Sequence, residues 1–437
     1  MNARADRFPL FDSLRAIAAL SVLGFHVGFF QLLRDDSVLR PYTSRLDVGV
    51  TIFFLISGFL LYRPFVAARA KPEADPPYAP AYAWRRFLRI TPAYWVALIA
   101  IALWLSLDEV WRDPLVFFGF AQIYDAKTSL GGIGQAWTLC VEITFYALLP
   151  IWAFVMRRLP GRGDSRRVMR QELIALALLW LFSLAYKVWA LRQVGPNDIR
   201  NGPYLQPLPN FLDQFALGMA LAVLTVHWEQ TGAPRIVAAL RRRDWIPWLV
   251  AAVAFWVVST RIGYSGVPFQ GSSRKMFLGR HELYSLVALC VLLPAILATP
   301  GRGFAGRILA NRVLLYLGLV SYVIYLYHFA VIHQLDKWIS LGGAPELRVL
   351  VHALLAIAAG TLLASASYYL VERPALRLKR LVRTPGRVAP DEATSEPAPA
   401  EPEADPDPAA RASSGSAATA TSTSKVTSAG WRKRGTP

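Results

Sequence analysis

Long apolar runs recur along the chain, separated by shorter polar segments. Each run is about twenty residues long, the length that an α-helix needs to cross the hydrocarbon core of a bilayer. The pattern therefore predicts an all-α, polytopic membrane bundle of about ten transmembrane helices. The ten runs cover residues 11–33, 46–66, 91–107, 136–156, 172–192, 208–228, 245–262, 281–300, 312–335 and 349–371.

Two segments depart from this pattern. The apolar run at 114–120 is too short to span and is expected to be a re-entrant or interfacial piece. From Pro385 onward the sequence turns to Pro, Ala, Ser, Thr and Glu, as in "EPAPAEPEADPDPAA". Such a composition buries too little apolar surface to fold. We therefore expect a transmembrane domain over 1–384 and a disordered tail over 385–437.

Composition and charge support a membrane protein. The chain is 54% hydrophobic and only 17% charged, which is too apolar for a soluble protein of 437 residues. Its net charge of +18 lies in short clusters between the apolar runs, so the lipid bilayer is the expected partner and nucleic acid is not. Cys140 and Cys290 lie inside apolar runs and are expected to pack there. No metal site is predicted.

The loops between the runs predict an orientation. One alternate set carries 27 Lys and Arg residues and the opposite set carries 13. Because cytoplasmic loops are enriched in these residues, the first set is expected in the cytoplasm, together with both termini and the tail. The loop at 261–280 fits least well, because it is external on this count yet carries four basic residues.

The first apolar run carries ionisable residues, which are costly within a membrane and are functional candidates for that reason. Arg15 and His26 are eleven positions apart. Eleven residues are three helical turns, which places both on one face about 16 Å apart. Asp12 lies one turn before Arg15 and can pair with it or cap the helix. The alternative is that Arg15 reaches the interface while His26 is a hydrogen-bonded core residue.

Other runs place polar residues at a similar depth. Glu142 lies in the fourth run, with Thr138 and Tyr146 one turn to either side. Asp213 begins the sixth run, and the ninth contains Ser321, Tyr325 and His328 at helical spacing. With the orientation above, His26, Glu142, Asp213 and His328 fall in the outer half of the membrane. We expect them to line one cavity, although Glu142 and Asp213 could instead bridge helices.

A cluster of arginines precedes the third run in "WRRFLRITP". Arg86 and Arg89 are one turn apart on the same helical face, with Arg85 adjacent. Guanidinium groups in such an arrangement suit a phosphate clamp. Anchoring at the cytoplasmic interface explains the cluster equally well.

Taken in order, these motifs resemble the acyltransferase-3 family of membrane O-acyltransferases. The resemblance rests on Arg15 and His26, "GVTIFFLISGFLL", Arg86 with Arg89, the block around Glu142, "FALGM", "SYVIYLYH" and "VERP", and covers residues 8–380. It implies that His26 is the catalytic base and that Arg15, Arg86 and Arg89 engage an acyl-coenzyme A donor. Glu142 is a second catalytic candidate, and either Glu142 or Asp213 could orient His26. Asp12, Asp213, Tyr325 and His328 complete the predicted cavity.

The same resemblance implies an acetyl or short acyl donor, no permanently bound cofactor and a hydroxyl acceptor, with a sugar favoured. Acceptors in this family range from surface glycans and glycolipids to glycosylated natural products. Some members carry a fused extracytoplasmic domain. This chain shows only the tail, so a separate extracytoplasmic partner could complete the transfer. The expected location is the bacterial plasma membrane.

Two other functions are compatible with polar groups at mid-depth. A transporter or exporter of an acylated metabolite or organic acid would also need them. The paired, Gly/Pro-interrupted halves of an inverted-repeat transporter are not visible in the sequence, which favours the enzyme. A receptor or scaffold whose tail recruits partners is the third alternative.

Overall fold

The computed structural model describes residues 8–32, 37–71, 73–196, 198, 201–262, 273–339 and 342–382. Throughout these residues the secondary structure is helical and contains no strand, as predicted. The tail expected over 385–437 lies outside the described residues. Ten long helices follow one another: α1 (Leu10–Leu32), α3 (Val48–Ala70), α4 (Ala79–Leu105), α7 (Trp137–Arg158), α8 (Ser165–Gln193), α10 (Leu212–Thr231), α12 (Ile246–Thr260), α13 (Arg274–Leu297), α15 (Arg312–Trp338) and α16 (Pro345–Ser367).

These helices correspond one to one to the ten predicted spans. In the described part of the chain, eight are long and apolar enough to cross a membrane. The other two are α10, which has polar residues in its first and last turns, and α12, an apolar helix of 15 residues. A polytopic all-α membrane bundle is therefore confirmed.

Short helices connect the long ones. The predicted piece at 114–120 forms a five-residue helix, α6, which follows the equally short α5. A π-helical turn, Tyr368–Glu372, continues α16 into α17. The short helices are α2 (Arg40–Thr43), α5 (Asp108–Arg112), α6 (Pro114–Phe118), α9 (Gly202–Leu205), α11 (Arg235–Arg242), α14 (Phe304–Leu309) and α17 (Arg373–Arg377).

Helices α4, α8 and α13 begin well before the apolar runs that they contain. Helix α4 starts at Ala79, so Arg86 and Arg89 lie within it. Helix α8 starts at Ser165, where the Asp164 carboxylate accepts hydrogen bonds from the backbone N–H groups of Arg166 and Arg167. Hydropathy locates only the part of a helix that meets lipid, whereas caps and turn residues determine where it begins.

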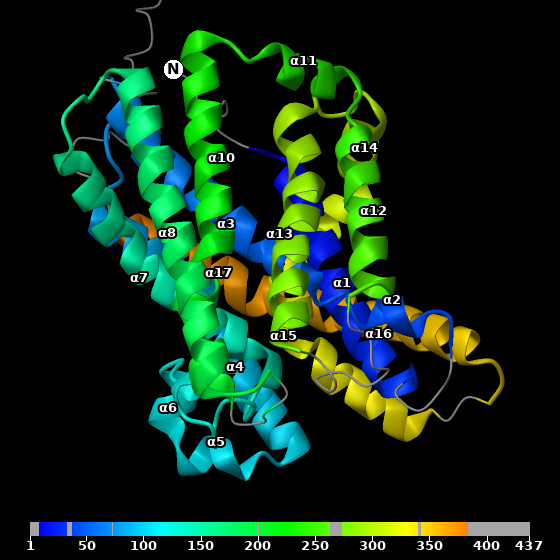
Figure 1. Cartoon of the computed structure of the whole chain (residues 1–437). Coiled ribbons are helices and arrows are strands. Elements are labelled where there is room, and N and C mark those ends of the chain that lie inside the picture. The colour runs from blue at the N-terminus through cyan, green and yellow to red at the C-terminus, as the bar shows by residue number, and fades with distance from the viewer. Residues whose placement is uncertain are drawn as a thin grey trace, which may run out of the picture. The chain divides into compact units, whose positions relative to one another are not determined.

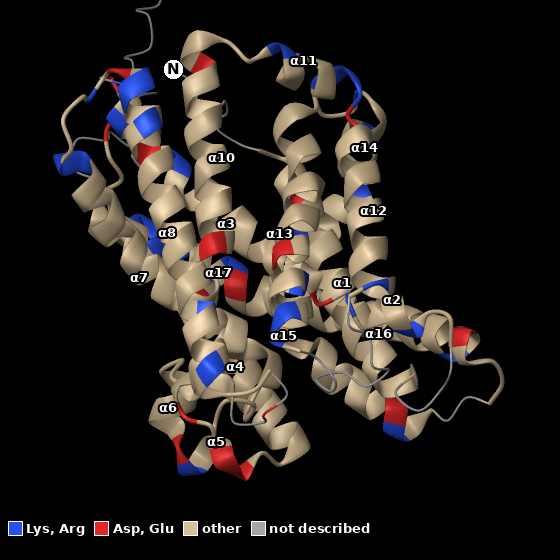
Figure 2. Ribbon diagram, in the orientation of Figure 1, with Lys and Arg blue, Asp and Glu red and all other residues tan. Residues whose placement is uncertain are grey.

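Figure 1 shows α8 beside α10 and α12 beside α13, with α11 at one end of this group and α5 and α6 toward the other. Figure 2 shows that Lys and Arg gather near the end that carries α11, while the middle of the bundle is mostly uncharged. The last turns of α7 and α11 contribute Arg157, Arg158, Arg241 and Arg242 to this end. The excess of Lys and Arg at one end of the bundle agrees with the unequal numbers of basic residues in the two sets of loops.

Helices α1 and α15 run in parallel and pack closely along their length. A Cβ added to Gly318 of α15 would lie 1.8 Å from the Asp12 carbonyl oxygen of α1, so only glycine allows this approach. At the far ends, the Gln31 side-chain amide donates to Asp336 at 2.7 Å. The pairing brings the middle of α15, which carries His328, against His26.

Helices α3 and α10 form a second close pair. A Cβ at Gly58 would lie 2.3 Å from the Phe215 carbonyl oxygen, and one at Gly218 would lie 2.2 Å from that of Leu55. Small residues let membrane helices approach in this way. The contact fixes α10 against the wall of the cavity described below.

Candidate active site

A cavity of ≈ 210 Å³ lies among α1, α3, α4, α7 and α15. Its polar lining comes from one or more residues of each helix, and its apolar lining comes mainly from α3. Five residues predicted from the sequence line it together: Arg15, Arg86, Arg89, Glu142 and Tyr325. Side chains 310 positions apart in sequence therefore meet at one site.

Three guanidinium groups lie at this cavity, each with a different partner. Arg15 pairs with Asp12 at 2.5 Å, as the spacing predicted. Arg89 lies 3.7 Å from the carboxylate of Glu372, which is 1% exposed and accepts no hydrogen bond from the described residues. Arg86 lies over the rings of Tyr82 and Tyr146, with its guanidinium carbon 5.9 and 6.0 Å from their centres.

Glu372 was not singled out from the sequence, although it lies in the quoted "VERP" segment. Its position in a π-helical turn directs it toward Arg89 of α4. Such turns within α-helices are frequent at functional sites.

Glu142 faces the cavity from α7 and is held by two hydroxyl groups. Tyr146, one turn along the same helix, donates to one carboxylate oxygen at 2.9 Å, and Ser57 of α3 donates to the other at 3.1 Å. The contact with Tyr146 joins two residues one turn apart on the same face of α7. Across the described residues, Glu142 has no hydrogen bond to His26.

His26 instead meets His328 of α15. Nε2 of His328 lies 3.0 Å from Nδ1 of His26, and the same Nδ1 lies 3.0 Å from the Val22 carbonyl oxygen. Tyr325 lines the cavity, and its ring centre lies 5.6 Å from that of His328. Neither histidine lines the cavity itself, although both were predicted to, and Asp12, also predicted there, pairs with Arg15 without lining it.

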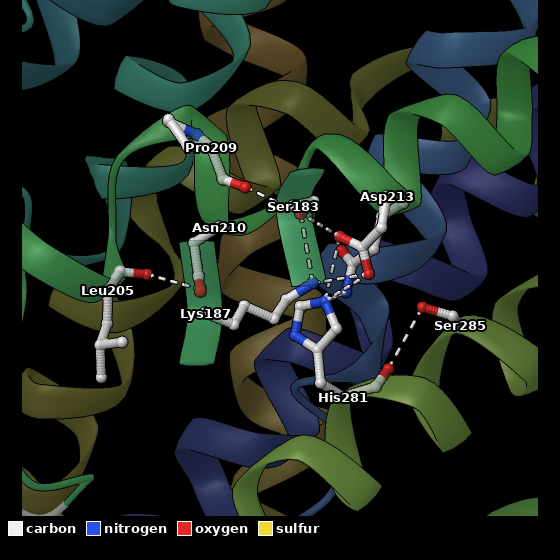
Figure 3. Close-up of polar contacts among 9 residues, drawn as sticks. Ser183, Lys187, Leu205, Pro209, Asn210, Asp213, His281 and Ser285 are labelled. Carbon is white, nitrogen blue, oxygen red and sulfur yellow. Dashed lines mark hydrogen bonds and ion pairs between the residues drawn. The ribbon is translucent and has the colours of Figure 1, made fainter. Parts of the chain in front are cut away.

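Asp213 lies in a separate buried cluster between α8, α10 and α13. It contacts Lys187 at 2.7 Å, Nε2 of His281 at 3.0 Å and the Ser183 hydroxyl at 3.0 Å (Figure 3). Gln214 also contacts His281, at 3.0 Å. All five side chains are buried.

Two predictions about Asp213 are therefore wrong. It is not among the residues that line the cavity. Phe54 lines the cavity and meets Phe211 edge-on, and the Phe211 ring in turn contacts the His281 ring of the Asp213 cluster. It does not orient His26 either, because Lys187, His281 and Ser183 occupy its carboxylate. The expectation that Glu142 could orient His26 is also wrong, because the hydrogen-bond partners of His26 are His328 and the Val22 carbonyl oxygen. Lys187 in an apolar helix was the sequence signal for this cluster, because a buried lysine requires a carboxylate partner.

We expect Lys187→Met to destabilise the protein by about 3–5 kcal/mol, because it leaves the Asp213 carboxylate buried without its cation. Thermal unfolding in detergent, followed by tryptophan fluorescence, measures the loss, and Lys127→Met in an exposed loop is the matched control. A Lys187→Met protein as stable as the wild type would instead show that the Asp213 carboxylate does not depend on this cation.

The described residues contain no group of three His, Cys, Asp or Glu side chains placed to hold a metal ion. The cavity and the residues next to it bring together three guanidiniums, a hydroxyl-bound carboxylate and a histidine pair. This combination is suited to binding an anion and moving a proton.

Comparison with known proteins agrees with this class of site. The family model described as "Acyltransferase domain" (Acyl_transf_3) matches residues 9–369. The chain belongs to this acyltransferase family. No solved structure matches it.

Three relatives illustrate the range of the family. Acyltransferase MdmB of Streptomyces mycarofaciens is 29% identical over 426 residues, which cover 91% of this chain and 98% of that protein. Nodulation protein 10 of Rhizobium leguminosarum bv. viciae is 25% identical, covering 84% of this chain and 93% of its own. Peptidoglycan O-acetyltransferase OatA of Listeria monocytogenes is 22% identical over 84% of this chain, which spans only 55% of that protein.

Proposed function

We propose that this protein is a membrane O-acyltransferase that moves an acetyl or other short acyl group from acyl-coenzyme A to a hydroxyl group, with a sugar as acceptor. The observation that carries the proposal is the placement of Arg15, Arg86 and Arg89 on one cavity, with His26 further along the helix that carries Arg15. The family membership supports the acyltransferase class.

The donor assignment follows from the charge of the cavity. Coenzyme A carries several phosphate charges at one end of a long, thin arm and a thioester at the other. Guanidinium groups form charge-assisted, forked hydrogen bonds with phosphate. The separation of eleven positions between Arg15 and His26 corresponds to about 16 Å of helix, which the arm can span while the phosphates stay at the arginines.

Glu142 lies between these two ends of the proposed path. Its carboxylate faces the cavity and accepts hydrogen bonds from Ser57 and Tyr146. A carboxylate has further acceptor capacity. We assign it to accept hydrogen bonds from the amide N–H groups of the donor's arm, which would direct the thioester toward Tyr325 and the histidine pair.

The transfer requires one base. A ring nitrogen of His26 takes the proton of the acceptor hydroxyl as its oxygen attacks the thioester carbonyl carbon. The tetrahedral intermediate then breaks its carbon–sulfur bond, and the imidazolium returns the proton to the departing thiolate. The products are an ester and the free thiol of coenzyme A. Imidazole suits both steps because it changes charge near neutral pH.

The proposal that the acceptor is a sugar is supported by the names of related proteins. One matched protein is named a peptidoglycan O-acetyltransferase, and peptidoglycan contains a carbohydrate. That protein is almost twice as long as the matched region. A separate extracytoplasmic partner could supply the part that this chain does not match.

We propose a bacterial plasma-membrane location with both termini in the cytoplasm. Reporter fusions at residue 165 and at the C-terminus should read cytoplasmic, and a fusion at residue 200 should read external, because 27 of the basic loop residues lie on the first side and 13 on the other. Much of the loop at 261–280 lies outside the described residues. A cytoplasmic reading from a fusion in that loop would overturn the assignment for α12 and α13.

The function is tested with purified protein in nanodiscs, which provide no second compartment. Labelled acetyl-coenzyme A and a panel of sugar acceptors should give an acylated product and an equal amount of free thiol. A transporter of acylated metabolites would bind its cargo in this assay but form no ester. Binding of ligands without any product from the panel or from a cell-wall extract would contradict the proposed activity.

A further inference from the structure

The contact between His26 and His328 determines which ring nitrogen is the base. His328 is 0% exposed, whereas His26 is partly exposed. Nδ1 of His328 lies 2.7 Å from the Tyr325 carbonyl oxygen, and its Nε2 lies 3.0 Å from Nδ1 of His26. Each ring nitrogen of His328 therefore has one partner.

The chemical nature of these partners determines which ring nitrogens of His328 and His26 carry hydrogen. A carbonyl oxygen can only accept a hydrogen bond, so Nδ1 of His328 must carry hydrogen. A neutral imidazole has one N–H, which leaves Nε2 of His328 as an acceptor. Nδ1 of His26 must then be the donor in the contact between the rings. The Val22 carbonyl oxygen, 3.0 Å from the same Nδ1, independently requires hydrogen at that atom.

The Tyr325 carbonyl group, which accepts the hydrogen bond from Nδ1 of His328, is itself held in place. The side-chain amide of Gln135 donates to the carbonyl oxygens of Tyr325 at 3.2 Å and Leu326 at 2.9 Å. The Tyr325 hydroxyl in turn donates to the Gln135 carbonyl oxygen at 2.9 Å. The turn of α15 that orients His328 is therefore fixed from outside the helix.

We infer that His328 is a positioning residue that holds His26 in the tautomer with hydrogen on Nδ1, so that Nε2 of His26 carries the free lone pair and accepts the hydroxyl proton. The inference rests on the proposed function for the identity of the base. His328 cannot be that base, because it is fully buried and both of its ring nitrogens are occupied. A second histidine thus takes the place that a carboxylate holds in many catalytic triads.

The first test compares His328→Gln with His328→Leu. The amide oxygen of glutamine reaches a position comparable to Nε2 and can accept from Nδ1 of His26, whereas leucine cannot. We expect His328→Gln to retain kcat within about tenfold and His328→Leu to lose about 10²-fold, the lower range for disabled general-base catalysis. The KM for the acyl donor should change little in either. Equal loss in both variants, or full activity in both, would overturn the inference.

The second test reads the tautomer in the wild-type protein and uses a variant only to assign the signals. In the wild-type protein labelled with ¹⁵N-histidine, solid-state NMR reports which ring nitrogens carry hydrogen, and the His26 signals are those lost in His26→Gln. We expect a protonated Nδ1 and an unprotonated Nε2. A protonated Nε2 in an active wild-type enzyme overturns the inference alone. The expected tautomer in a protein with no transferase activity leaves the inference standing and overturns the proposed function.

Discussion

His26→Gln is expected to lower the rate of acyl transfer by about 10²–10⁴-fold, the usual contribution of a general base. Glutamine keeps a polar group of comparable reach but accepts no proton at neutral pH. The donor cavity should be unaffected, because its lining does not include His26. The variant should therefore bind acyl-coenzyme A with nearly the wild-type affinity while product formation collapses.

The matched control is His227→Gln. His227 lies near the end of α10 and hydrogen-bonds to Ser165 at 2.7 Å, far along the chain from the cavity-lining residues. Glutamine can keep a hydrogen bond to that hydroxyl, so this variant should be close to wild type. Single-turnover kinetics and equilibrium donor binding, measured on the same preparations, separate the two effects. A His26→Gln protein that transfers at the wild-type rate would remove His26 from the mechanism.

Arg86→Gln and Arg89→Gln are expected to weaken donor binding by roughly ten- to a hundredfold each. Losing a charge-assisted phosphate contact typically costs about 1.5–3 kcal/mol. Arg86 should show the larger effect, because its guanidinium lies over the rings of Tyr82 and Tyr146, whereas Arg89 has the Glu372 carboxylate at 3.7 Å. The apparent constant for acyl-coenzyme A should rise, and the constant for the acceptor should change little.

Arg85→Gln is the control for this pair. Arg85 belongs to the same basic cluster but does not line the cavity. If the cluster only anchors α4 at the membrane surface, all three variants should lose insertion to a similar extent and bind the donor normally once inserted. If the apparent constant for acyl-coenzyme A rises in Arg86→Gln and Arg89→Gln but not in Arg85→Gln, the cluster does more than anchor the helix.

The sequence predicted the elements of the site better than their arrangement. Hydropathy located every long helix, because a bilayer imposes one length and one polarity on all of them. The spacing of Arg15 and His26 follows from helix geometry alone, and the pairing of Glu142 with Tyr146 follows from their separation of one turn. All of these are properties of single helices.

The relations between helices could not be predicted in this way. The depth of a residue in the membrane can be predicted from the sequence. The rotation of each helix about its axis, and which helices it packs against, depend on side-chain packing. Asp213 was expected beside His26 because their depths were similar, yet its carboxylate pairs with Lys187 and His281 in a separate cluster. His328 meets His26 because Gly318 lets α15 approach α1. A glycine contact across 300 positions leaves no signal in a single sequence.

In the proposed mechanism the donor enters the arginine-lined cavity and presents its thioester to the histidine pair. A cryo-electron microscopy structure with a non-hydrolysable acetyl-coenzyme A analogue tests this placement. We expect phosphate density against Arg15, Arg86 and Arg89, with the thioester position directed past Tyr325 toward Nε2 of His26. Density for the analogue at another surface of the protein, with this cavity empty at saturating concentration, would contradict it.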